Sequence, residues 1–445
     1  MLIDYIKTQL KKKHFLSLGS SVFMSGAGML TFVLLLRSMK MEEMGYWIFF
    51  QSSFTLLDMC RAGFLQTALI KFYAGTEISR AKEVLGSIWF IAILITIFWI
   101  VLTIPSLFLM PLIKDESIKI VIQWFALKFV LTLPSTLSAW QLQADQKFDK
   151  LLQISFITHC SFISMVVAMM LTGTMSITNL LIADMLVSTI ITTLCLIRGW
   201  TGISYIASRT KECMLEVYNF GKFSIGTSIS ANLLRNSDVF MINFFLGAAF
   251  VPIYNVAQRL MEVIEIPLRS ILVIAIPELS AAFNKKRIDD VVFYLRKYSG
   301  MLTLGLIPIC IVGVSLADVF VALLGGGKYV GTDAANIFRI FLILSIIYPI
   351  DRFTGVSLDI VHQPKRNLIK VIIMLVLNVS LNYVGIMLFR NLFGVVLSSV
   401  ISFIVGALYS YFSLKKFLPF NLKDILTSGV YELKYLYNRF ITRTV

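Results

Sequence analysis

Charged side chains lie inside apolar stretches of this chain that are long enough to cross a lipid bilayer. Between residues 229 and 282 they include Arg235, Asp238, Arg259, Glu262, Glu265 and Arg269. A charge in hydrocarbon costs on the order of several kcal/mol unless it faces water or a partner. We therefore expect the helices that carry these residues to line something other than lipid.

Two pairs of opposite charge have the spacing of neighbours on one helix face. Asp58 and Arg61 are three residues apart, as are Arg235 and Asp238, and Asn232 lies one turn before the second pair. Residues three or four apart on a helix can contact each other. Two interpretations stay open for each pair: a neutral structural bridge, or charges that face a polar cavity.

A longer polar stripe and an isolated lysine favour a cavity. Arg259, Glu262, Glu265 and Arg269 step by three, three and four residues, which is more charge than one bridge needs. Lys128 lies within another apolar stretch and has no carboxylate one turn away. We interpret Lys128 as a cation that faces the cavity.

The composition predicts an all-α integral membrane protein. Of 445 residues, 58% are hydrophobic and 15% are charged, and the mean hydropathy is +0.83. Soluble domains are about a quarter charged. Apolar runs of about 20 residues, the length that spans a bilayer, predict twelve transmembrane helices near 15–36, 45–69, 85–112, 118–142, 151–173, 177–197, 219–247, 250–281, 299–324, 335–359, 369–389 and 392–414.

Basic residues predict how the helices are oriented. Most of the 40 Lys and Arg residues fall at alternate connections and at both termini, and the opposite side carries only Arg37, Lys40, Lys114, Lys119, Lys328 and Arg390. The positive-inside rule makes the basic side, with both termini, cytoplasmic. Because the basic residues are dispersed among short loops, the net charge of +15 does not indicate a nucleic-acid partner.

The chain divides into two halves of six predicted helices. The longest polar connection separates the sixth span from the seventh, which gives lobes at 1–210 and 211–420 and a basic tail at 421–445. Tyr46 and Gln51 of the first half correspond roughly to Tyr254 and Gln258 of the second, so the lobes resemble parallel repeats. The tail is either an amphipathic helix on the inner leaflet or poorly ordered.

The sequence lacks the motifs of a metal site and of an ATP site. The five cysteines have no C-x-x-C spacing, and the three histidines share no metal-ligand spacing, so no metal site is expected. The GGGK segment at 325–328 lacks the earlier Gly and the following Ser or Thr of a phosphate loop, so no ATP site is expected. The apolar run that follows Lys11–Lys13 is long enough to span rather than serve as a cleaved signal.

Residues 235–283 resemble the seventh and eighth helices of Wzx-type polysaccharide-lipid flippases. These flippases belong to the multidrug/oligosaccharidyl-lipid/polysaccharide (MOP) exporter superfamily. The matching residues are Arg235, Asp238, Phe245-Leu246-Gly247, Tyr254, Ala257 and Pro277-Glu278-Leu279-Ser280. The predicted twelve spans and the chain length extend the resemblance over the whole sequence.

The resemblance implies two six-helix lobes around a central cationic cavity, in the bacterial inner membrane. The cargo would be an oligosaccharide repeat unit on undecaprenyl diphosphate, moved from the inner to the outer leaflet by alternating access for surface polysaccharide such as O-antigen of lipopolysaccharide. We assign diphosphate or glycan contact to Arg61, Lys128, Arg235, Arg259 and Arg269, and further sugar contacts to Asn232, Tyr254, Asn255 and Gln258. Asp58, Asp238, Glu262 and Glu265 would hold those cations in place or couple transport to an ion.

Several alternatives stay open. A multidrug (MATE-type) exporter is the main rival, but its sites favour cationic drugs and unpaired carboxylates, whereas cations at least match acids here. A membrane enzyme such as a glycan polymerase or ligase usually has a large outer loop, and the longest expected here is short. Peptidoglycan-precursor flippases are close relatives that often have two extra spans. Coupling to protons, to sodium or to the membrane potential is undecided, as are partnerships with a polysaccharide polymerase and a chain-length regulator.

Overall fold

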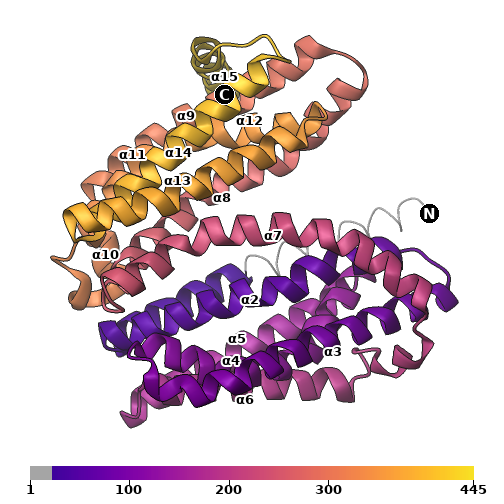
Figure 1. Cartoon of the computed structure of the whole chain (residues 1–445). Helices are drawn as coiled ribbons and strands as arrows, with labels where there is room; N and C mark the ends of the chain where they lie inside the picture. The colour runs from indigo at the N-terminus through magenta and orange to yellow at the C-terminus, as the bar shows by residue number, and fades with distance from the viewer. Residues whose placement is uncertain (1–22, 445) are drawn as a thin grey trace. The chain divides into compact units, whose positions relative to one another are not determined.

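The computed structural model describes residues 23–444, and the segment over 15–22 of the first predicted span lies outside them. The described chain is helical almost throughout (Figure 1). A helix over Phe23–Ser38 comes first. Then follow α2 (Met41–Tyr73), α3 (Ile78–Leu109), α4 (Glu116–Ala144), α5 (Phe148–Thr172), α6 (Ile177–Ile197), α7 (Lys211–Phe245), α8 (Phe250–Asn284), α9 (Ile288–Ser315), α10 (Ala317–Gly325), α11 (Ala334–Ser345), α12 (Tyr348–Ile360), α13 (Pro364–Phe389), α14 (Leu392–Lys415) and α15 (Leu422–Thr444).

Local signals account for many helix ends. Gly173 ends α5 in the left-handed conformation, with φ of 69°, which glycine adopts at no steric cost. Ser176 then caps α6 by accepting a hydrogen bond from the Asn179 backbone N–H at 3.2 Å. Asp115 caps α4 in the same way through Ser117. Such short capped connections keep successive helices antiparallel neighbours.

Contacts divide the chain into two units, residues 1–239 and 240–445. In the N-terminal unit, α2 packs on α3 and α4, and α4 packs on α5 and α6. Its core contains Leu65, Trp89 and Leu137, from α2, α3 and α4, together with Cys213 and Val217 from the start of α7. The beginning of α7 is therefore part of this packing. The expected lobe boundary at 210/211 stays a prediction.

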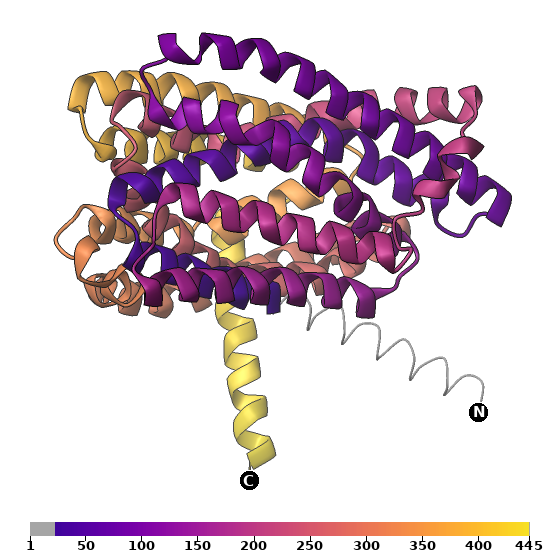
Figure 2. The same ribbon diagram turned by 90° about the horizontal axis from the view of Figure 1, so that it is seen from below.

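The C-terminal unit is built around α8, α9 and α12. α9 packs on α8, α12 and α15, and α13 packs on α14. The core contains Leu279 of α8, Leu295 of α9, Phe353 of α12, Leu414 of α14 and Ile425 of α15. The last helix thus contributes to the core of this unit, while its later turns extend beyond the other helices of the unit (Figure 2). The tail is helical, as one of the two sequence interpretations expected; its place on the inner leaflet stays a prediction.

Each predicted span coincides with helical structure in the described residues, but not every helix is apolar enough to span on its own composition. Seven of the described helices have both the length and the hydropathy, or eight if one bent pair counts as a single span. α2, α7 and α8 have 33, 35 and 35 residues, and they carry all the charged residues that the sequence assigned to the cavity except Lys128. The count of twelve stays a prediction.

Two predicted spans are interrupted. The span expected over 299–324 is divided into α9 and α10. The span expected over 335–359 is broken into α11 and α12, which are bent by 51°, and Pro349 lies in the first turn of α12. Proline is well tolerated there because a first-turn N–H has no helical partner to lose. By contrast, Pro267 and Pro308 lie within the continuous helices α8 and α9.

Candidate functional site

Arg61 and Asp58 form a buried pair in the N-terminal unit. The Arg61 side chain is 0% exposed, and its Nη2 lies 2.7 Å from Oδ1 of Asp58. Nη1 donates to the Phe129 carbonyl at 3.1 Å, Nη2 donates to the Thr132 hydroxyl at 3.3 Å, and the guanidinium lies 4.2 Å from the centre of the Phe129 ring. These contacts tie α2 to α4. They support the structural interpretation of this pair.

Lys128 is also buried and paired. Its side chain is 7% exposed, and Nζ lies 2.6 Å from Oδ2 of Asp184 on α6. Nζ also donates to Oε1 of Gln51 on α2 at 3.0 Å. Sequence reasoning missed both partners, because they lie 56 and 77 residues away along the chain.

The charges of the cluster that joins α2, α4 and α6 therefore balance. Asp58 and Asp184 carry as much negative charge as Arg61 and Lys128 carry positive charge, and each acid contacts one of the two bases. A neutral cluster exerts little attraction on a distant anion. Assignment of Arg61 and Lys128 to cargo contact stays a prediction.

The predicted polar residues of α7 differ in exposure. Arg235 is exposed, Asp238 is buried, and Asn232 is partly buried. The Asn232 side chain donates to the Ser228 carbonyl one turn earlier at 3.1 Å. Of the three, Arg235 presents most surface to its surroundings.

The charged stripe on α8 is exposed and forms pairs along the helix. Arg259 Nη1 lies 2.9 Å from Oε2 of Glu262, with side chains 42% and 39% exposed. Arg269 Nη2 lies 2.8 Å from Oε2 of Glu265, and the Arg269 side chain is 63% exposed. The expected face therefore exists within the C-terminal unit, with each arginine beside a glutamate.

The uncharged polar residues of α8 are less exposed than the charged stripe. Tyr254 is 1% exposed and packs edge-on against the ring of Phe341 on α11 at 5.8 Å. Asn255 is buried and donates to the Val251 carbonyl at 3.1 Å. Gln258 is partly exposed. The sugar-contact assignments of all three stay predictions, and burial favours Gln258 among them.

Arg352 joins the α8 stripe from a different helix. Its Nη2 lies 3.9 Å from Oε1 of Glu265, and its side chain is 54% exposed. Glu265 is thus placed between Arg269 and Arg352. The sequence showed Arg352 only as a polar residue inside a predicted span; the bend between α11 and α12 brings it to α8.

A third buried ion pair, in the C-terminal unit, was not expected. Lys370 Nζ lies 2.5 Å from Oδ1 of Asp351, with side chains 8% and 5% exposed. Lys370 lies within α13 and is buried. The pair joins α12 to α13 at the residue next to Arg352.

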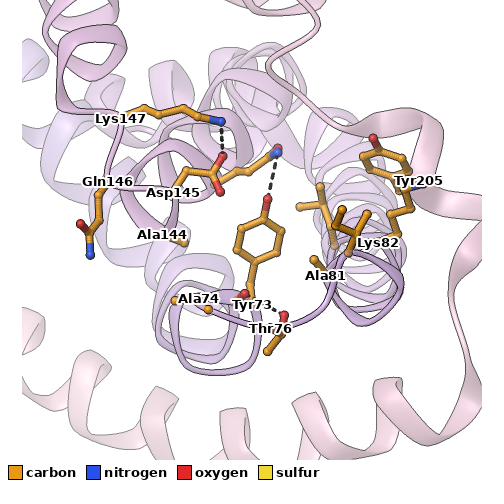
Figure 3. Close-up of a pocket in the computed structure, with 14 residues that line it drawn as sticks. Tyr73, Ala74, Thr76, Ala81, Lys82, Ala144, Asp145, Gln146, Lys147 and Tyr205 are labelled. Atoms are coloured by element: carbon orange, nitrogen blue, oxygen red, sulfur yellow. Dashed lines mark hydrogen bonds and ion pairs between the residues drawn. The ribbon is translucent and has the colours of Figure 1, made fainter.

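A pocket of about 520 Å³ lies away from all of these charges, at one end of the N-terminal unit. Figure 3 shows it between the end of α2, the start of α3 and the end of α4. Lys147 pairs with Asp145 at 2.7 Å, and Gln141 donates to the Tyr73 hydroxyl at 3.5 Å. Because the residues that line the pocket include both positive and negative side chains, the lining does not favour one class of ligand.

Comparisons with known proteins agree with this architecture. Residues 10–283 match the family model described as "Polysaccharide biosynthesis protein", and residues 224–384 match the MatE model. No curated protein matches the sequence.

Solved structures match over nearly the whole chain. The lipid II flippase MurJ is 18% identical, with a TM-score of 0.75, covering 96% of this chain and 93% of that one. A multidrug resistance MATE family transporter of the MOP superfamily is 14% identical, with a TM-score of 0.71 and coverage of 88% and 96%. A MOP superfamily transporter from Pyrococcus furiosus is 15% identical, with a TM-score of 0.56 and coverage of 92% and 95%.

Proposed function

Because this chain belongs to the polysaccharide biosynthesis protein family and has the fold of MOP superfamily transporters, we propose that it is a flippase for a lipid-linked oligosaccharide. The cargo is a repeat unit on undecaprenyl diphosphate, moved from the inner to the outer leaflet of the bacterial inner membrane. The product supplies surface polysaccharide such as O-antigen. Alternating access by the two halves carries the cargo head across, while the prenyl chain stays in lipid.

One observation carries the proposal: the exposed charged face of the C-terminal unit has an excess of arginine. Arg259, Arg269 and Arg352 face two carboxylates, Glu262 and Glu265. Exposed arginines inside a membrane protein are costly against lipid and well suited to the paired oxygens of a diphosphate. The balanced, buried cluster of the N-terminal unit lacks that excess.

Other polar groups on α7 and α8 suit the remainder of the cargo. Arg235 is exposed on α7, and Gln258 and Asn232 are accessible amides that suit sugar hydroxyls. Tyr254 and Asn255 are packed inside the C-terminal unit, and in this proposal they shape α8 instead of contacting sugar. Glu262 and Glu265 hold the arginines in place, and Asp58 does the same for Arg61.

Removal of the exposed arginines tests the proposal. We expect Arg269→Ala and Arg352→Ala, separately and together, to reduce surface glycan at least about tenfold, since each good ionic contact is worth about 1.5–3 kcal/mol. Surface glycan is measured by immunoblot in a deletion strain, together with the undecaprenyl-linked repeat unit that should accumulate. The control is Arg287→Ala, at the exposed start of α9.

Protein amount and membrane insertion are measured for every variant. Normal glycan export by the double variant, at normal protein level, would refute the proposed function. A loss that equally affects Arg287→Ala would point to general damage and not to cargo contact.

The match of residues 224–384 to the MatE model supports a second candidate, an ion-coupled multidrug or metabolite exporter. That function predicts that the deletion strain becomes drug-sensitive while its surface glycan is unchanged. The flippase proposal predicts the reverse pattern. One strain and two assays therefore separate the two candidates.

A further inference from the structure

The ammonium group of Lys128 lies inside an aromatic cage. Its Nζ is 4.5 Å from the centre of the Phe54 ring, 5.3 Å from that of Phe50 and 6.0 Å from that of Trp47. All three rings belong to α2, at the spacing of one helix face. The cage is closed by Asp184 Oδ2 at 2.6 Å and by Gln51 Oε1 at 3.0 Å.

These groups have the chemistry of a binding site for a small cation. Aromatic faces attract cations through their negative quadrupole, a carboxylate supplies the opposite charge, and an amide oxygen accepts a hydrogen bond. The aromatic walls are supported from outside, because Phe54 packs on Phe129 at 6.3 Å and Trp47 stacks on Phe162 at 5.8 Å. The walls are therefore held by α4 and α5 as well as by the lysine.

We propose that Asp184, Gln51, Phe50 and Phe54 form a binding site for a primary ammonium ion, and that Lys128 occupies it as a covalently attached ligand. The site joins α2, α4 and α6. Lys128 is thus a positioning residue that fixes these three helices, and it leaves cargo recognition to other groups. The inference is independent of which cargo the protein carries.

If the Lys128 side chain acts as a covalently attached ligand, a free ammonium ion of the same size should be able to replace it. Lys128→Ala removes three methylene groups and the ammonium, which together correspond to n-propylammonium. The variant leaves the Asp184 carboxylate facing apolar rings without its counter-charge, which is strongly destabilising for a buried pair. A bound ligand stabilises the folded protein in proportion to its occupancy of the site.

The experiment uses the purified full-length protein in detergent and measures the midpoint of thermal unfolding. We expect Lys128→Ala to unfold at a lower temperature than the unchanged protein. Addition of n-propylammonium chloride should raise that midpoint by about 2 °C or more relative to equal sodium chloride, and leave the unchanged protein unaffected. n-Propanol, which lacks the charge, should have no such effect.

A double variant shows whether the ligand acts at the proposed site. Lys128→Ala combined with Asp184→Asn should no longer respond to n-propylammonium. The proposal is wrong if n-propylammonium fails to stabilise Lys128→Ala, or if it stabilises the double variant to the same extent.

Should Lys128→Ala not yield folded protein, a second pair of variants decides the question. Lys128→Met fills the cage and leaves Asp184 unpaired, whereas Lys128→Met with Asp184→Asn removes both charges. We expect the double variant to unfold at a higher temperature than the single one. Equal midpoints would overturn the assignment of Asp184 as the counter-charge, and no cargo is needed for either result.

Discussion

Arg61 shows how a single residue can place a charge at the centre of a membrane helix bundle. Its guanidinium is fully buried, and it contacts the Asp58 carboxylate, the Phe129 carbonyl and the Thr132 hydroxyl. Such a group is tolerated because its charge and most of its donors are satisfied within the protein. Each residue of the pair therefore neutralises the charge of the other, and loss of either one leaves an uncompensated charge in the protein interior.

We predict that Arg61→Met destabilises the protein by about 3–5 kcal/mol, because it leaves Asp58 buried and unpaired. Arg61→Met with Asp58→Asn should recover most of the loss, since no uncompensated charge remains. Thermal unfolding of the purified variants measures both effects. The control is Arg198→Met, an exposed arginine at the end of α6; a single variant at position 61 as stable as this control would contradict the prediction.

At the residue scale, the sequence revealed the local pairs and missed the distant ones. Asp58–Arg61, Arg259–Glu262 and Glu265–Arg269 are three or four residues apart, a spacing that any helix brings together. The partners of other groups, such as Asp184 for Lys128, lie on other helices. No local spacing predicts them, because the packing of helices decides which faces meet.

At the scale of elements, α15 and α9 cross at a pair of glycines. A Cβ added to Gly300 would lie 2.1 Å from the Ile425 carbonyl oxygen and 2.9 Å from the Gly429 nitrogen. The crossing is held by an ion pair between Arg296 and Asp424 at 3.0 Å. Close approach of two backbones requires small residues at the crossing.

We predict that Gly300→Ala displaces α15 from α9, because backbone atoms that cannot move aside lie within the contact distance of the new methyl group. The C-terminal helix should then become more sensitive to protease in membrane vesicles, with cleavage at least several times faster. Gly305→Ala is the matched control, since a Cβ there meets nothing within 4 Å. Equal cleavage of both variants would show that the crossing does not depend on glycine.

The elements themselves were predictable to differing degrees. Helix positions follow from the lengths of the apolar runs, and proline at the start of α12 marks a real break. The prolines inside α8 and α9 do not interrupt those helices, because neighbouring packing can compensate for a missing hydrogen bond. Whether a proline breaks a helix is thus a question of its surroundings.

At the scale of the whole molecule, the distribution of basic residues predicts the orientation in the membrane. Connections such as α8–α9 are rich in lysine and arginine, whereas the connection between α10 and α11 carries Lys328 alone. The positive-inside rule places the first type in the cytoplasm and the second outside. Both termini are then expected in the cytoplasm.

We predict that a cysteine in place of Lys328 reacts with a membrane-impermeant maleimide in intact spheroplasts, whereas a cysteine in place of Lys285 reacts only after permeabilisation. Both substitutions are made in a background without the five native cysteines. Both positions lie at exposed connections, so access to the reagent decides the result. The opposite labelling pattern would show that the orientation is inverted.

The sequence by itself determined that this is a helical membrane protein, where its helices lie, and which charges share a helix face. Those features depend on the lengths of apolar runs and on a fixed helical period, and both are local. Only the tertiary structure decided which charges meet across helices: Lys128 with Asp184, Lys370 with Asp351, and Glu265 with Arg352. An ion pair between helices forms where their packed faces meet, and that meeting depends on the packing of the bundle rather than on any local spacing.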